Sequence, residues 1–219
     1  MLKKLSLLGI ISPFLYLLHV IVGSILWKGY NQITQPISDL TANGAPNKDM
    51  LCVITSMYGL FQLIFIISAY VYLRKLKIKA INVSMMLFIV MTLITFSYGV
   101  FPEDIPGTIT TFNGLMHLVV TGLIVPIAIL APLFAGVGFK ELKNFKCFSV
   151  YSIITSITIF VSGGVSVIIM ANKIPIFGVI ERINIGSLEL WFIVFALMLF
   201  TIDIGSITIK EKDKREHFN

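Results

Sequence analysis

The sequence predicts an all-α fold: a polytopic membrane protein built as a six-helix transmembrane bundle. Of its 219 residues, 57% are hydrophobic and only 13% are charged, and the mean hydropathy is +0.93. Soluble domains contain about 45–50% apolar and about 25% charged residues. The apolar residues also form long runs without the polar alternation that a membrane β-barrel requires. This composition excludes a separate soluble catalytic domain.

Six apolar stretches are each long enough to cross a hydrocarbon core of roughly 30 Å as a helix. Their expected bounds are about 6–28, 51–73, 80–101, 113–136, 147–170 and 187–209. The chain is therefore expected to form one transmembrane domain over residues 1–209, followed by a charged cytoplasmic tail over 210–219. A run of small residues at 162–166 is expected to let the fifth span approach a neighbouring helix closely.

Basic residues are distributed unequally between the two sets of connections. One set of segments holds 13 of the 17 basic residues: Lys3, Lys4, Arg74, Lys75, Lys77, Lys79, Lys140, Lys143, Lys146, Lys210, Lys212, Lys214 and Arg215. By the positive-inside rule, both termini are then cytoplasmic and the protein is a multi-pass protein of the cell membrane. The basic clusters beside the span ends account for the net charge of +6, because they meet anionic lipid headgroups. Membrane lipids are therefore the expected partners, and no nucleic-acid partner is expected.

The opposite, outer connections collect the acidic residues. The first connection, about 29–50, contains Ser38–Asp39, and the spacing of Ile37 and Leu40 predicts a short helix in it. His117 lies about four residues into the fourth span, roughly 6 Å below its start. The candidate outer-face pocket consists of Ser38, Asp39, Glu103, Asp104, His117, Glu181 and Arg182.

Unpaired charge is costly in lipid, so these side chains are expected to turn toward one another. Arg182 would neutralise one carboxylate, and another would accept a hydrogen bond from His117. His19 and Asp203, which also lie in spans, are interpreted as packing residues rather than functional ones, and their roles stay open.

Metal and cofactor sites are not predicted. Cys52 and Cys147 fall at opposite membrane faces, too far apart for a disulfide. A metal site needs three or four suitable ligands, and the chain has no HExxH spacing, phosphate-binding glycine loop or dinucleotide fingerprint. We therefore expect no metal and no cofactor.

Four short motifs occur in order along nearly the whole chain. They are Pro36–Ile37–Ser38–Asp39–Leu40 with Gly44–Ala45–Pro46, Phe101–Pro102–Glu103–Asp104, Gly114–Leu115–Met116–His117, and Gly178–Val179–Ile180–Glu181–Arg182. The pattern resembles the six-helix membrane family called domain of unknown function 998, found in bacteria and archaea. That family usually has Glu where this chain has Asp39, which keeps the charge but shortens its reach. The resemblance implies the topology and these residues, and no particular reaction.

Three functions fit these residues. The first is an integral membrane protein that binds a lipid headgroup or a small polar solute in the outer-face pocket. The second is a membrane-embedded enzyme acting on a lipid at the outer leaflet, with His117 as general acid or base and Asp104 orienting it. The third, a transporter or permease subunit, is weakened by the sparse charge within the spans. Whether the protein is an enzyme therefore stays open at this point.

Overall fold

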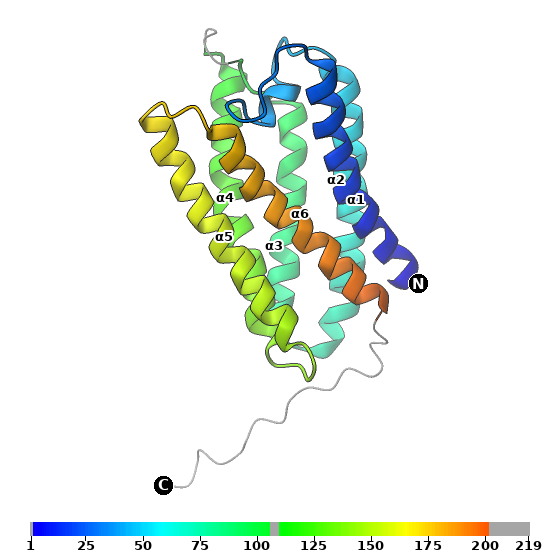
Figure 1. The fold of residues 1–219 in the computed structure, drawn as a ribbon. Helices are drawn as coiled ribbons and strands as arrows, with labels where there is room; N and C mark the ends of the chain where they lie inside the picture. Colours follow the sequence, from blue (N-terminus) through cyan, green and yellow to red (C-terminus); the bar gives the residue numbers. More distant parts are fainter. Residues whose placement is uncertain (1, 106–109, 202–219) are drawn as a thin grey trace, which may run out of the picture.

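The protein is an all-α bundle of long helices (Figure 1). The structure is a computed structural model that describes residues 2–105 and 110–201. The helices are α1 (Leu2–Leu26), α2 (Lys48–Leu73), α3 (Lys79–Thr95), α4 (Phe112–Phe139), α5 (Lys146–Ala171) and α6 (Phe177–Thr201), with 3-10 turns η1 (Ser38–Thr41), η2 (Arg74–Leu76) and η3 (Phe96–Gly99). Within the described residues, six helices are long and apolar enough to cross a membrane, so the protein is a multi-pass membrane protein. The predicted fold class is confirmed.

Helix α6 begins earlier than the sequence predicts. It starts at Phe177 instead of at about 187, so Glu181 and Arg182 belong to its first turns and not to the preceding loop. These two charged residues made the segment look like a loop in the sequence, because their hydrogen-bond partners lie in the α1–α2 connection, far away along the chain. The predicted residues 202–209 of the last span, including Asp203, and the tail over 210–219 lie outside the described residues.

The helices form a closed ring in which each packs against its sequence neighbours and α6 returns to α1. The start of α1 and the end of α6 lie at the same end of the bundle (Figure 1). The α2–α3 and α4–α5 connections share that end, which we call the basic end because it carries Lys3, Lys4, Arg74, Lys75, Lys77, Lys79, Lys140, Lys143 and Lys146. The opposite end, where α1–α2, α3–α4 and α5–α6 connect, is called the acidic end.

Aromatic side chains fill much of the bundle interior. Trp191 of α6 stacks on Phe88 of α3 with ring centroids 4.7 Å apart and on Phe195 at 4.9 Å. Phe148 of α5 packs on Phe139 of α4 and on Phe195. These fully or almost fully buried rings join four helices into one apolar core, which we call the aromatic core.

Two glycines of α4 allow close backbone approach to the neighbouring helices α3 and α5. A Cβ built on Gly138 would lie 2.7 Å from the backbone nitrogen of Ile81, and one on Gly136 would lie 2.8 Å from the Ser149 carbonyl oxygen. By contrast, nothing lies within 4 Å of a Cβ on Gly164. The expected close approach at 162–166 is therefore wrong at Gly164, because that glycine faces away from the neighbouring helices.

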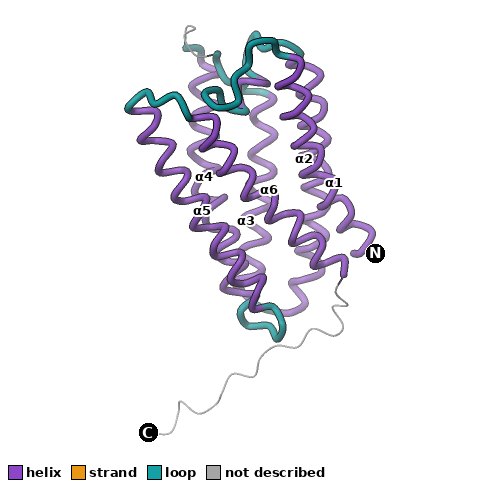
Figure 2. The backbone as a smooth tube through the Cα atoms, viewed as in Figure 1, coloured by secondary structure: helices purple, strands orange, loops and turns teal. Residues whose placement is uncertain are grey.

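The α1–α2 connection lies across the acidic end of the bundle (Figure 2). Its predicted short helix is present as η1, and Leu40 there is fully buried beside Gly23 of α1. The Tyr30 hydroxyl donates to the Pro36 carbonyl oxygen at 2.6 Å. The connection is thus a packed part of the bundle, and it can position side chains as firmly as a helix does.

Candidate functional site

Glu181 joins the α1–α2 connection to α6. Its carboxylate accepts hydrogen bonds from the Ile37 backbone N–H and, at 3.4 Å, from the Ser38 hydroxyl. Glu181 therefore fixes Ser38 and Asp39 over the end of the bundle. We call Ser38, Asp39, Glu103, His117, Glu181 and Arg182 the polar cluster.

Arg182 secures the same connection through different atoms. Its guanidinium donates to the Gln35 carbonyl oxygen at 3.0 Å, to the Gly178 carbonyl oxygen at 2.8 Å and to the Tyr30 hydroxyl at 2.7 Å. Among the described residues it forms no ion pair with a carboxylate. The expected direct pairing of Arg182 with a carboxylate is therefore wrong: carbonyl and phenol oxygens bind Nη1 and Nη2, and the buried Nε has no hydrogen-bond partner among the described residues.

His117 is buried and held in one orientation. Its Nδ1 lies 3.1 Å from the Phe101 carbonyl oxygen, and its ring packs on Tyr98 with centroids 4.6 Å apart. A carbonyl oxygen can only accept, so Nδ1 carries the hydrogen and Nε2 is the free basic atom. Nε2 lies 4.0 Å from Oε2 of Glu103. The structure thus brings one carboxylate close to His117, but the expected hydrogen bond from His117 to a carboxylate is absent among the described residues, where Glu103 Oε2 has no hydrogen-bond partner.

The carboxyl groups of the polar cluster retain protons more readily than free ones. Burial raises the pKa of Asp39 to about 6, against 3.8 for a free group, and the Glu103 charge adds to that rise while the Gln35 amide opposes it. Burial also raises the pKa of Glu103. Within the described part of the chain, Oδ1 of Asp39 and Oε2 of Glu103 have no hydrogen-bond partner. Both atoms are buried acceptors that the described residues leave unsatisfied.

Asp104 has a different role from the one expected. Its two carboxylate oxygens accept hydrogen bonds from the backbone N–H of Thr111 at 2.7 Å and from the Thr111 hydroxyl at 2.9 Å. These bonds hold the pKa of Asp104 below its usual value. Thr111 in turn caps α4 by accepting from Gly114 N–H. Asp104 therefore supports the start of α4, and Phe101, not Asp104, orients His117.

A protein-family model described as "Protein of unknown function (DUF998)" matches residues 10–198. The chain belongs to the DUF998 family. No curated protein and no solved structure gives a significant match. The match spans the whole of the polar cluster, so the predicted family resemblance is confirmed.

Polar groups that the sequence reasoning did not single out continue the cluster of this DUF998 protein into the bundle. The Tyr98 hydroxyl lies 3.0 Å from the Thr121 hydroxyl, and the Tyr58 hydroxyl donates to Oε1 of Glu189 at 2.7 Å. Tyr16 packs on Tyr58 with ring centroids 5.1 Å apart. The signal in the sequence was the presence of tyrosines within apolar spans. The late predicted start of α6 hid Glu189, because position 189 then lies only two residues inside the predicted span 187–209.

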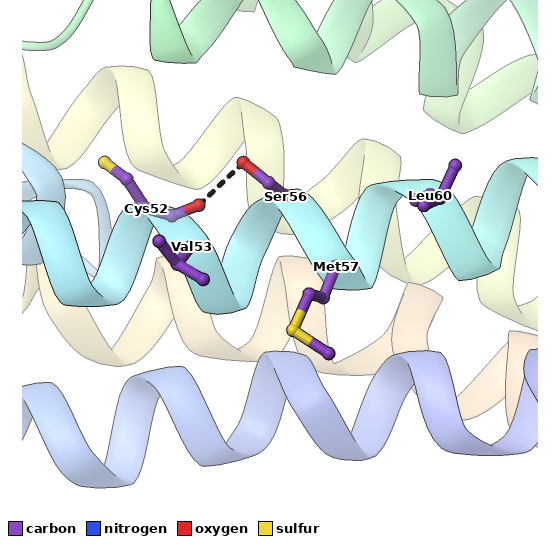
Figure 3. A pocket seen from close by; sticks show the side chains of 5 residues that line it. All are labelled: Cys52, Val53, Ser56, Met57 and Leu60. Atoms are coloured by element: carbon purple, nitrogen blue, oxygen red, sulfur yellow. Dashed lines mark hydrogen bonds between the residues drawn. The ribbon is translucent and has the colours of Figure 1, made fainter.

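Two shallow hollows in this DUF998 protein lie on exposed helix surfaces, apart from the polar cluster. One, of about 340 Å³, is lined by Cys52, Val53, Ser56, Met57 and Leu60 of α2 (Figure 3). The other, of about 360 Å³, lies between α5 and α6. Their walls are mostly apolar, which suits surfaces in contact with lipid tails. Both cysteines are free, so the prediction that they do not pair is confirmed.

Metal ligation has no geometric support in the described part of the chain. There, no three His, Cys, Asp or Glu side chains are arranged to hold a metal ion. His19 is buried and packs edge-on against Tyr16, with centroids 5.4 Å apart. Both of its ring nitrogens lack a hydrogen-bond partner among the described residues, so its role stays open.

Proposed function

We propose that this protein lies in the cell membrane with both termini in the cytoplasm and binds a small positively charged group at the polar cluster on the outer face. The orientation is supported by the basic residues gathered at the end that holds the start of α1 and the end of α6. The ligand is an ammonium group, carried either by a lipid headgroup or by a small solute.

This proposal is based on the carboxyl groups of Asp39 and Glu103. Each has a buried oxygen without a hydrogen-bond partner within the described residues, and the cation of the cluster, Arg182, is already bound to carbonyl oxygens. Buried polar atoms are normally satisfied, so such atoms are suited to receive a donor from outside the chain. An ammonium group supplies both hydrogen-bond donors and a compensating positive charge.

A second function, an enzyme acting on a lipid at the outer leaflet, is favoured by the geometry of His117. Its tautomer is set by Phe101, and its basic Nε2 lies near the Glu103 carboxyl. Such a pair can take up and return a proton during bond cleavage. A transporter is less favoured, because the aromatic core joins α3, α4, α5 and α6 inside the bundle and obstructs a polar path toward the basic end.

The test compares lipids that differ in headgroup charge. The purified protein is melted in detergent with added phosphatidylethanolamine, phosphatidylglycerol or ethanolamine alone. If the protein binds an ammonium group, phosphatidylethanolamine or ethanolamine should raise its free energy of unfolding by RT ln(1 + [L]/Kd), and phosphatidylglycerol should not. Stabilisation by ethanolamine alone identifies a solute site, and stabilisation by the phospholipid alone identifies a headgroup site.

Two variants and one control decide the residues involved. Glu103→Gln should abolish the ligand-dependent rise in melting temperature, while Glu141→Gln, at an exposed position of the basic end, should preserve it. Mass spectrometry of the lipid after incubation then separates binding from catalysis. Product that disappears in His117→Gln supports the enzyme, and intact lipid supports the binder. Equal stabilisation by every lipid in wild type and Glu103→Gln contradicts the binding proposal.

A further inference from the structure

Glu189 lies deep within the bundle. It is 12 positions after the start of α6, which corresponds to about 18 Å along the helix. A hydrocarbon core is roughly 30 Å thick, so Glu189 is near the middle of the membrane. The residue is only 8% exposed, so it faces the interior of the bundle and not the lipid.

The Glu189 carboxyl has one partner. Oε1 accepts from the Tyr58 hydroxyl, whereas Oε2 has no hydrogen-bond partner in the described part of the chain. No described Lys, Arg or His forms an ion pair with Glu189. An ionised carboxylate so placed is strongly disfavoured, because a single hydroxyl partner does not compensate for its lost hydration. The carboxyl group therefore carries a proton, which resides on Oε2 because Oε1 is the acceptor.

The elements packed around Glu189 supply hydroxyl groups. From α1, Tyr16 packs on the Tyr58 ring and lies within electrostatic range of both Glu189 and Glu181. Buried His19 is next to Tyr16 on the same helix. From α5 comes the uncharged Ser152 hydroxyl, which accepts a hydrogen bond from the Trp191 indole N–H of α6 at 2.9 Å.

Tyr16 therefore stands between Glu189 and the acidic end. Its side chain also packs against the apolar residues under η1, Ile37, Leu40 and Leu51, which places it directly below the polar cluster. At the acidic end, α6 contributes two ionisable side chains of that cluster, Glu181 and Arg182. Hydroxyls can pass a proton between two carboxyl groups because each is both donor and acceptor.

We propose that Glu189 is an intramembrane proton-binding site that exchanges its proton with the polar cluster through the Tyr58 and Tyr16 hydroxyls. Inward transfer follows the existing hydrogen bond: an ionised Glu189 takes the Tyr58 proton at Oε1, Tyr58 takes one from the Tyr16 hydroxyl, and Tyr16 takes one from the protonated Glu181 carboxyl. Outward transfer reverses each of these steps. The number of protons and the total charge of the group stay constant. The protein thereby links protonation at mid-membrane to the occupancy of the outer cluster.

Infrared spectroscopy tests this proposal without a ligand, so its outcome is independent of the proposed binding function. Wild-type protein in lipid should show a protonated-carboxyl band at neutral pH that Glu189→Gln removes. Tyr58→Phe should shift that band, because it removes the hydrogen bond to the carbonyl oxygen. Tyr58→Phe also keeps the experiment decisive if Glu189→Gln does not fold. A band unchanged by both substitutions would overturn the proposal.

The route is tested by transfer into deuterated buffer. The Glu189 band should move to the deuterated position in wild type, and Tyr16→Phe should slow this change about tenfold or more. Tyr70→Phe, near the other end of α2 beside Arg74, is the matched control and should leave the rate unchanged. Equal exchange in wild type, Tyr16→Phe and Tyr70→Phe would refute the hydroxyl relay.

Discussion

Replacing Asp39 with Asn should stabilise the protein at alkaline pH and do little in acid. Burial gives Asp39 a pKa of about 6 in the folded protein, against 3.8 for a free carboxyl. The folded state therefore binds this proton more tightly than the unfolded state. Its contribution to stability is complete below about pH 4 and is lost as the pH rises through about 6. Asn carries no charge, and its amide oxygen can still accept the Gln35 hydrogen bond of 3.2 Å.

The magnitude follows from the pKa difference. At 1.36 kcal/mol per pKa unit, ionising Asp39 costs the fold about 3 kcal/mol above pH 6. Water entry and relaxation reduce the penalty of a buried charge, so we expect a net gain of about 1–2 kcal/mol for the variant. For a chain of this size, 1 kcal/mol corresponds to about 2–4 °C in melting temperature.

The assay is thermal melting in detergent, followed by tryptophan fluorescence at about pH 4 and about pH 8. Asp39→Asn should melt roughly 2–8 °C above wild type at the higher pH and near wild type at the lower one. Asp49→Asn, at an exposed position in the first turn of α2, serves as the control. A variant that loses stability equally at both pH values would show that Asp39 is ionised and favourably bound, and would refute this reasoning.

The other predictions concern packing, capping and orientation. Gly138→Ala should lower the free energy of unfolding by about 1–3 kcal/mol, because its Cβ would lie 2.7 Å from the backbone of α3. Gly164→Ala, with open space around it, should leave that free energy unchanged or raise it by up to about 1 kcal/mol. Thr111→Val, which removes the hydroxyl that caps α4, should cost about 1 kcal/mol in chemical unfolding. In a variant without its native cysteines, a cysteine at Asn43 should react with an impermeant thiol reagent on intact cells and one at Lys143 should not; the opposite labelling would reverse the proposed orientation.

The sequence by itself determined the fold class and most of the polar cluster. A membrane imposes a minimum length on an apolar helix, so six spans were readable from composition and run length alone. Antiparallel spans also bring alternate connections to one end, which predicts that Ser38, Asp39, Glu103 and Glu181 share it. These inferences depend on distances along the chain, and a single sequence contains that information.

Tertiary structure decided which atoms meet. Glu103 and Asp104 are adjacent and chemically alike, yet Glu103 faces His117 whereas Asp104 binds Thr111, the N-cap of α4. Likewise, Gly138 meets the backbone of α3 whereas Gly164 meets nothing within 4 Å. Such differences depend on how each helix is rotated about its axis. In apolar spans that rotation is set by side-chain packing between helices, because the hydropathy pattern hardly distinguishes one helix face from another.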